Sequence, residues 1–280
     1  MKSGSTAVSD IIVHASELEN RCEYEPAVSV FLTPAEQEEL WRTVRYPHRL
    51  FFWGGFSDAE RRAAVFLPEW AADGAPPEEQ LRRSSPAREA YLKELIFGED
   101  APFEELSTKI ALIRISGSGH RTLAHKDILG SIMALGITRQ SLGDICMISD
   151  HEAVAVLSGK LTDYVAEELT KAGADGVKVS LHPDPANFYY ERQFEEVCTT
   201  VASLRLDGIV SALTGMSRTK AAEHITAGLV QLSGTLCDEV ARDVSVGDTL
   251  TVRGYGKYLL SSTDGLTRKS RLRITAKKYI

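Results

Sequence analysis

The sequence lacks the patterns that indicate a metal centre, a disulfide framework or a membrane-spanning segment. Its four cysteines lie tens of residues apart, with no C-x-x-C pair and no histidine at ligand spacing, so we expect buried thiols. No stretch approaches about eighteen consecutive apolar residues, and the opening MKSGSTAVSD has no apolar core. We therefore expect no signal peptide, no membrane partner and a cytoplasmic protein.

Catalytic signatures are also missing. The chain contains no G-x-S-x-G elbow, no G-x-x-x-x-G-K phosphate loop and no H-E-x-x-H pair. The glycines of Ser116–His120 lack the rest of a phosphate loop and indicate only a turn. We therefore predict a protein that is not an enzyme and that uses no cofactor and no metal.

Basic residues are in the minority overall but are concentrated at one end. The whole chain has 32 Lys and Arg against 39 Asp and Glu, a net charge of −7. From Ser203 onward there are 12 basic and 7 acidic residues, whereas the first 202 residues have 20 and 32, a net charge of −12. From Arg253 to Ile280, 8 basic residues accompany the single Asp264. This asymmetry favours a nucleic-acid-binding carboxy-terminal module.

Length and patterning predict an α+β protein of three domains. With 280 residues, of which 43% are hydrophobic, the chain is long enough for two or three globular domains. Residues 1–76 are predicted to be a small α/β domain with a helix near Ile11–Arg21 and a helix that Thr33 caps. Two strands, 49–52 and 63–67, follow, and the Pro-rich and acidic ADGAPPEEQ then indicates a linker.

The middle segment, residues 77–186, is predicted to be a ferredoxin-like domain. Its elements follow the order β-α-β-β-α-β, which is the split βαβ arrangement. The predicted strands are 109–115, 144–149, 153–157 and 177–181, and the predicted helices are 124–135 and 161–172. A second linker, HPDPANFYYERQ, is expected before a third domain of residues 200–280.

The stretch Ser203–Tyr258 predicts two short helices followed by a small sheet. Leu206, Ile209, Val210 and Leu213 recur at helical spacing, and Gly215 is suited to end that helix. A second helix is expected from a cap at Ser217 to a stop at Gly228. Such a tight corner exposes its basic residues, and the second helix's N-terminus favours a phosphate. Thr249–Arg253 alternates as a half-buried strand does, after a turn at Gly247-Asp248.

This stretch resembles the S-four RNA-binding domain, named for a small-subunit ribosomal protein. The residues that carry the resemblance are Leu204, Arg205, Leu206, Asp207, Ser217, Arg218, Lys220, Ala221, Gly228, Val230, Gly247, Asp248, Val252 and Gly254. Where a basic residue and an Asn-containing turn are usual in the family, this chain has Leu229 and Ser233-Gly234. We expect binding to shift toward Arg218, Lys220 and the carboxy-terminal strands.

The carboxy-terminal strand adds a predicted row of cations. Arg271, Arg273 and Lys277 alternate with apolar residues, so a strand would place the cations along one face. The complete set of predicted RNA-binding residues in this module is Arg205, Ser217, Arg218, Thr219, Lys220, Arg253, Tyr255, Lys257, Arg268, Lys269, Arg271, Arg273 and Lys277. Predicted contacts in the middle domain are His125, Lys126 and Arg139.

Several residues have a second interpretation. Tyr255 and Tyr258 lie in a run similar to half of an RNP1 signature, and Tyr255 could either stack on a base or pack on its own hairpin. Arg205-Leu206-Asp207 is similar to the catalytic-aspartate motif of pseudouridine synthases. A local role for Asp207, near a helix start and paired with Arg218 or Lys220, fits its position in the module better.

Over most of its length the chain also resembles the YlmH family of bacterial proteins. The matching runs are Phe31–Pro34, Gly54–Phe56, Glu60–Arg62, Leu123–Gly130, Met133–Ile137, Arg139 and Gly143–Ile145. The resemblance implies a non-enzymatic RNA-binding factor that acts in ribosome-associated quality control. The implied partners are ribosomal RNA, tRNA and the large ribosomal subunit, and we expect a monomer. The alternatives are an RNA-modifying enzyme of the pseudouridine-synthase kind and a cell-division adaptor that acts through the acidic amino-terminal portion.

Overall fold

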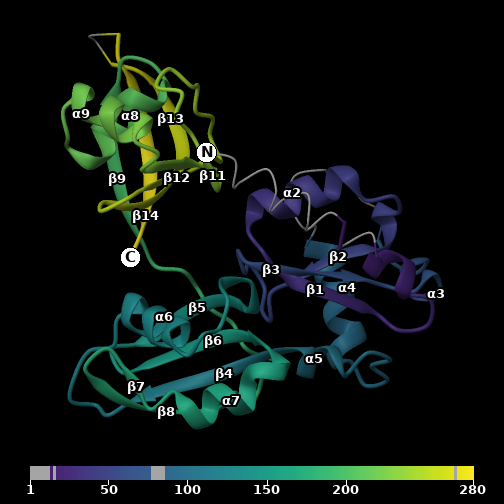
Figure 1. Cartoon of the computed structure of the whole chain (residues 1–280). Coiled ribbons are helices and arrows are strands. Elements are labelled where there is room, and N and C mark those ends of the chain that lie inside the picture. The colour runs from purple at the N-terminus through teal and green to yellow at the C-terminus, as the bar shows by residue number, and fades with distance from the viewer. Residues whose placement is uncertain (1–12, 15–16, 77–85, 268–269) are drawn as a thin grey trace. The chain divides into compact units, whose positions relative to one another are not determined.

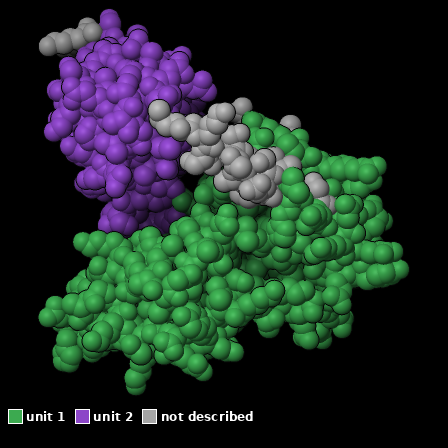
Figure 2. All heavy atoms as spheres, viewed as in Figure 1, with its two compact units in different colours: residues 1–190 green, residues 191–280 purple. Residues whose placement is uncertain are grey.

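The protein is a mixed α/β molecule whose contacts divide it into two compact units, residues 1–190 and 191–280 (Figures 1 and 2). The computed structural model describes residues 13–14, 17–76, 86–267 and 270–280. None of the helices in these described ranges has the length and hydrophobicity of a membrane span. The predicted boundary near residue 76 adjoins a segment, 77–85, that lies outside the described residues, so the three-domain division stays a prediction.

The first unit begins with a small antiparallel sheet. Its strand order is β1-β3-β2, from β1 (Ala27–Leu32), β3 (Arg62–Phe66) and β2 (Leu50–Trp53). Helix α2 (Pro34–Thr43) starts as predicted: Thr33 caps it in a reciprocal capping box with Glu36, and Pro34 occupies its first turn. Residues 13–14 and 17–21 are helical, and the rest of the predicted helix over 11–21 lies outside the described residues. Shorter elements of the unit are η1 (Pro47–Arg49), α3 (Glu69–Ala72), α4 (Pro86–Phe97) and α5 (Leu106–Lys109).

A five-stranded antiparallel sheet completes the first unit. It has the order β5-β6-β4-β8-β7. Its strands are β4 (Ile110–Gly117), β5 (Leu142–Ser149), β6 (Glu152–Ser158), β7 (Lys171–Ala172) and β8 (Asp175–Leu181). Helices α6 (His125–Ala134) and α7 (Thr162–Glu168) and the turns η2 (Arg139–Ser141) and η3 (Gly159–Leu161) connect them. The chain therefore follows the predicted β-α-β-β-α-β order, with β7 as an addition.

Both faces of this sheet are buried, each against a different partner. On β4, Ile113 and Ile115 face a core that includes Ile128 of α6 and Val165 of α7. Leu112, the residue before Ile113, belongs to the core that also holds residues of β1, β2 and β3. Gly55 shows how close the approach is, because a Cβ built there would lie 2.7 Å from Leu112 Cδ1. The amino-terminal sheet and the five-stranded sheet therefore share one hydrophobic core.

The second unit is a six-stranded antiparallel sheet with two helices on one face. The strand order is β11-β10-β12-β13-β14-β9, and α8 (Leu206–Thr214) and α9 (Arg218–Thr226) pack on it. The strands are β9 (Phe194–Val201), β10 (Val230–Leu232), β11 (Thr235–Leu236), β12 (Thr249–Val252), β13 (Gly256–Leu266) and β14 (Leu272–Tyr279). Leu250 and Val252 of β12 are buried, as their alternation predicts. Strand β9, most of which lies between the predicted linker and the predicted start of the third domain at residue 200, is the edge strand beside β14.

Candidate nucleic-acid interface

The corner between α8 and α9 has the predicted local geometry. Gly215 ends α8 in the left-handed region, with φ of 75°, where a residue with a Cβ would be strained. Ser217 caps α9, and its hydroxyl accepts a hydrogen bond from Lys220 N at 3.2 Å. Met216 is buried between the two helices. The turn is therefore fixed by packing and capping, and it holds the start of α9 at a defined position.

A buried carboxylate organises the basic residues of this corner. The Asp207 side chain is only 7% exposed. It accepts hydrogen bonds from Arg218 Nε at 2.8 Å and Nη2 at 3.2 Å, and longer ones from Arg205 Nε at 3.3 Å and Nη2 at 3.4 Å. Burial by itself raises the pKa of Asp207, but the hydrogen bonds from Arg218 and Arg205 outweigh it and hold that pKa below its usual value. The predicted local role of Asp207, pairing with Arg218, is confirmed.

The same contacts leave the corner positively charged. Two guanidinium groups share one carboxylate, and 42% of the Arg205 and 54% of the Arg218 side chain stay exposed. Lys220, Ser217 and Thr219 are exposed beside them. In the described part of the chain, the Lys220 ammonium group has no side-chain partner. The corner thus presents preorganised cations at the start of α9, which is the arrangement that a phosphate clamp needs.

The turn between β12 and β13 presents a second basic group. Arg253 is exposed there, and its backbone N–H donates to Leu229 O just beyond α9. Tyr255 packs against the core of the unit, with its ring 6.0 Å from that of His224 in an edge-on arrangement. The packing interpretation of Tyr255 therefore describes the unbound structure, and its stacking on a base stays a prediction.

The sheet face opposite the helices carries the remaining predicted cations. Arg273 and Lys277 of β14 are exposed while Ile274 and Ala276 are buried, so the predicted alternation is present. Lys277 Nζ lies 5.6 Å from the centre of the Phe194 ring, and Lys257 Nζ of β13 lies 4.7 Å from that of Tyr279. Arg268 and Lys269 lie outside the described residues.

The predicted residues therefore do not form a single continuous row. The corner residues stand on the helical side of the sheet, whereas Lys257, Arg273 and Lys277 stand on its other face. Arg271, just before β14, is the exception because its guanidinium reaches over the edge strand β9. Arg271 Nε donates to Thr200 Oγ1 at 3.1 Å, and Nη2 donates to Thr200 O at 2.6 Å.

In the first unit, Arg139 is held by its own turn. Its Nη1 donates to Leu142 O at 2.6 Å and to Gly143 O at 3.0 Å. Desolvation and the nearby charge of Arg61 lower the pKa of Arg139 to about 10, against the opposing effect of Asp144. His125 and Lys126 are exposed in the first turn of α6. Desolvation, followed by the charge of Arg139, lowers the pKa of His125, so His125 is a poor cation at neutral pH.

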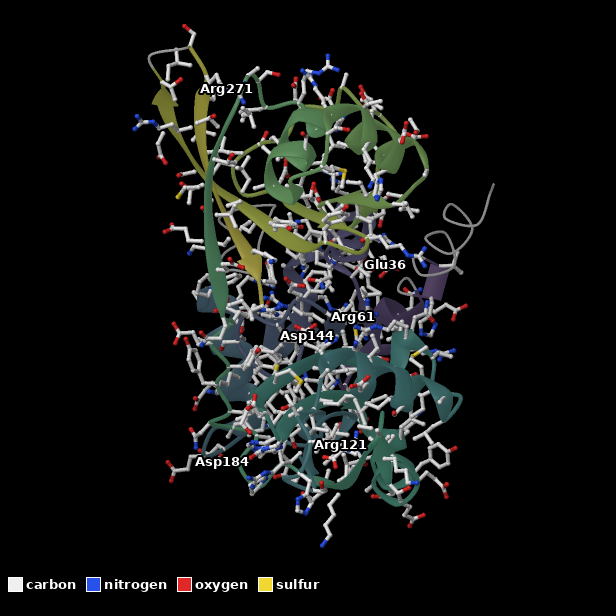
Figure 3. The ribbon with its side chains drawn as sticks, turned by 90° about the vertical axis from the view of Figure 1, so that its left-hand side faces the viewer. Glu36, Arg61, Arg121, Asp144, Asp184 and Arg271 are labelled. Carbon is white, nitrogen blue, oxygen red and sulfur yellow. The ribbon has the colours of Figure 1, made fainter. Side chains whose placement is uncertain are left out.

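Arg61 is a residue of this region whose importance the sequence reasoning did not identify. Its guanidinium donates to three backbone carbonyls: Phe31 O at 2.9 Å, Leu142 O at 3.1 Å and Arg139 O at 3.2 Å. Asp144 accepts the backbone N–H of Arg61 at 3.2 Å and that of Glu60 at 2.6 Å (Figure 3). The only sequence signal was the occurrence of Arg61, Arg139 and Asp144 in the runs that match the YlmH family.

No group of three or more histidine, cysteine, aspartate or glutamate side chains in the described ranges has the geometry to hold a metal ion. Cys22 and Cys146 are buried thiols that form no disulfide, as expected, whereas Cys198 is exposed on β9 and Cys237 is partly exposed.

Comparison with known proteins agrees with the sequence resemblance. The family model described as "Putative RNA-binding domain in YlmH" matches residues 104–186, which contain the five-stranded sheet. The chain is 28% identical over 255 residues to "Ribosome-associated protein quality control protein P2" of Bacillus subtilis (strain 168), covering 90% of this chain and 87% of that protein. The solved cell division protein ylmH from Streptococcus pneumoniae is 18% identical, with a TM-score of 0.42, covering 68% of this chain and 97% of that one. The family match and the Bacillus relative together support the resemblance to the YlmH family.

Proposed function

We propose that this protein is a non-enzymatic RNA-binding factor that acts on ribosomal RNA or tRNA at the large ribosomal subunit, in the quality control of stalled translation. The observation that carries the proposal is the α8–α9 corner, where Asp207 fixes two half-exposed guanidinium groups beside the exposed Lys220, whose ammonium group has no side-chain partner in the described residues. Cations that only keep a protein soluble do not need a fixed orientation, whereas a phosphate clamp does.

The comparisons support the class of ligand and the process. The family model over residues 104–186 is described as an RNA-binding domain, and the Bacillus subtilis relative is named as a ribosome-associated quality control protein. In this proposal the protein is a cytoplasmic monomer with two RNA-contacting regions. The corner residues Arg205, Arg218 and Lys220 clamp phosphates, Arg253, Lys257, Arg271 and Arg273 follow the backbone, and His125, Lys126 and Arg139 contribute from the first unit.

Salt dependence tests the phosphate clamp. If about five phosphates are contacted, counterion release predicts a log-log salt slope near −3.5. The double variant Arg218→Ala/Lys220→Ala removes about two contacts, so we expect weaker binding to every ribosomal RNA fragment and a slope flatter by about 1.4. Full-length protein and isolated large subunits are suitable for the measurement. A double variant with unchanged affinity and slope would refute the clamp.

The absence of catalysis has its own test. Mass spectrometry of ribosomal RNA and tRNA nucleosides from cells that lack the protein should show the full set of modifications. The disappearance of one modified nucleoside, restored by the wild-type chain, would instead make this protein a modifying enzyme.

A further inference from the structure

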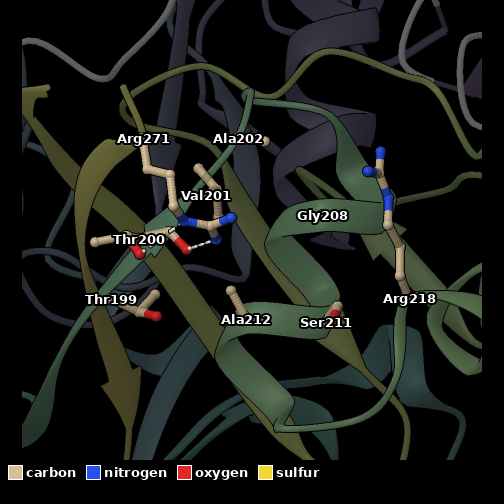
Figure 4. A pocket seen from close by; sticks show the side chains of 9 residues that line it. All are labelled: Thr199, Thr200, Val201, Ala202, Gly208, Ser211, Ala212, Arg218 and Arg271. Carbon is tan, nitrogen blue, oxygen red and sulfur yellow. Dashed lines mark hydrogen bonds between the residues drawn. The ribbon is translucent and has the colours of Figure 1, made fainter. Parts of the chain in front are cut away.

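A cavity in the second unit lies where the two sets of cations meet. Its volume is about 390 Å³, within the range of small-molecule sites. One wall is residues 199–202, at and just beyond the end of edge strand β9, and the other is α8. Arg271 stands at the β9 side of the cavity and Arg218 at the α8–α9 side (Figure 4).

The two arginines are held differently, and both keep donors available. Arg218 uses Nε and Nη2 for Asp207, whose charge it shares with Arg205. Arg271 is held only by the neutral oxygens of Thr200, so no carboxylate in the described residues offsets its charge. Nη1 of each guanidinium has no partner in the described part of the chain. The cavity is therefore bordered by a partly compensated guanidinium at Arg218 and by the guanidinium of Arg271, which has no carboxylate partner in the described residues.

The wall that α8 contributes consists of small residues. Gly208, Ser211 and Ala212 follow one another at helical spacing along the cavity. A Cβ built at Gly208 would meet only Ser203 O, at 3.8 Å, so the space beyond this glycine is open. Thr199, Thr200 and Ser211 also line the space. The Ser211 hydroxyl donates to Met216 O at 2.8 Å, and the Thr200 hydroxyl accepts from Arg271 Nε at 3.1 Å. The ribose-phosphate backbone of a single-stranded RNA, which carries 2′-hydroxyl groups, can approach such a wall of small side chains closely.

We propose that this cavity holds one nucleotide of single-stranded RNA, with the phosphates on its two sides bound by Arg218 and Arg271. The inference rests on the proposed RNA-binding function and specifies the form of RNA that the module prefers. Paired guanidinium groups match phosphate geometry, and neutral hydroxyls can bond a ribose 2′-hydroxyl. A single strand can place one nucleotide in a recess between a helix and a strand, whereas the nucleotides of a duplex stay stacked and paired.

A pair of matched variants tests the proposal with full-length protein and labelled oligouridylate. Arg271→Ala and Arg242→Ala each remove one positive charge from an exposed position of the second unit, but only Arg271 lines the cavity, and Arg242 is not among the proposed RNA contacts. We expect Arg271→Ala to weaken binding about tenfold and Arg242→Ala less than about threefold. Equal losses would mean general charge attraction and would overturn the assignment. If Arg271→Ala lowers stability but leaves RNA binding unchanged, Arg271 only holds strand β9 in place, and the assignment is likewise overturned.

A second pair changes the volume and leaves every charge in place. Gly208→Leu should fill the cavity and weaken oligouridylate binding about tenfold, whereas Gly208→Ala, whose Cβ fits, should bind as the wild type does. Oligodeoxyuridylate and a fully paired RNA hairpin should bind the wild type more weakly than oligouridylate. Unchanged binding by Gly208→Leu, with its fold verified by circular dichroism, would overturn the proposal.

The double variant Arg218→Ala/Lys220→Ala distinguishes a failure of the cavity proposal from a failure of the proposed RNA-binding function. If the cavity variants bind normally while Arg218→Ala/Lys220→Ala still loses affinity for large ribosomal subunits, the cavity assignment is wrong and the proposed function stands. If the wild-type protein binds neither oligouridylate nor ribosomal RNA, both are wrong.

Discussion

Two places in this molecule bring a pair of arginines close to one aspartate, and the two use the same residue types for different purposes. At the α8–α9 corner, Asp207 bonds the guanidinium groups of Arg205 and Arg218 directly, and about half of each arginine side chain stays exposed. In the first unit, the guanidinium groups of Arg61 and Arg139 bond backbone carbonyls, while Asp144 caps backbone N–H groups.

The two arrangements differ in the environment of their guanidinium groups. In the first unit the two guanidinium groups are partly desolvated and repel one another, which lowers the pKa of Arg139 to about 10. At the corner the hydrogen bond and charge of Asp207 raise the pKa of Arg218, and about half of the Arg218 side chain stays exposed. The first arrangement joins segments of the chain, and the second displays charge to a partner. Count and type of residue are therefore poor guides to function, and hydrogen-bond partners are better ones.

Removing Arg61 should have the largest effect on stability and the smallest on RNA affinity. Arg61→Ala removes a side-chain donor from three carbonyls of β1, η2 and β5, of which Leu142 O keeps its bond from Arg139, so we expect a loss of about 3 kcal/mol in the first unit. Hydrogen exchange resolved by mass spectrometry would measure it unit by unit. Arg121→Ala, at an exposed position of the same unit, is the control and should change little. If Arg61→Ala is as stable as the wild type but binds RNA weakly, Arg61 serves RNA binding rather than the fold.

Asp207→Asn should destabilise the second unit by about 2 kcal/mol at neutral pH, because the charge-assisted bonds to Arg218 and Arg205 weaken. Since the folded-state pKa of Asp207 is lowered, its contribution is complete above the usual carboxyl pKa of 3.8 and is lost as pH falls through the lower folded value. Denaturant unfolding of both proteins from pH 7 downward should therefore show the difference shrinking only below about pH 4. If the difference in unfolding free energy between the two proteins does not depend on pH, the geometry of the Asp207 side chain and not its charge stabilises the unit.

Lys220→Ala should affect binding without affecting stability. Its ammonium group has no side-chain partner in the described residues, so we expect an RNA salt slope flatter by about 0.7 and unfolding within about 0.5 kcal/mol of the wild type. Parallel fluorescence titrations at several salt concentrations would measure it. A stability loss comparable with that of Asp207→Asn would show that Lys220 belongs to the framework.

The smallest effect concerns His125. Desolvation and the charge of Arg139 lower its pKa, so its ring should titrate below pH 6.5 in an NMR experiment. In Arg139→Gln the midpoint should rise toward the usual value, because one of the two causes is removed. If the midpoint stays unchanged in the variant, Arg139 does not act on His125 electrostatically.

The sequence by itself determined the features that depend on neighbouring residues. Helix ends are set by short-range capping and backbone geometry, and the structure has them where the sequence predicts, at Thr33, Pro34, Gly215 and Ser217. The alternation in β14 similarly determines which side chains are buried. These signals survive because they need only a few consecutive residues.

Tertiary structure alone decided which distant groups meet. Strand β9 begins with Phe194-Glu195-Glu196, a poor strand signal, and becomes the sheet edge because β14 offers it a ladder of backbone partners. The same pairing brings Thr200 to Arg271, and the packing of α8 beside β9 leaves the cavity between Arg271 and Arg218. Such meetings join residues far apart in the chain, and local patterns carry no information about them.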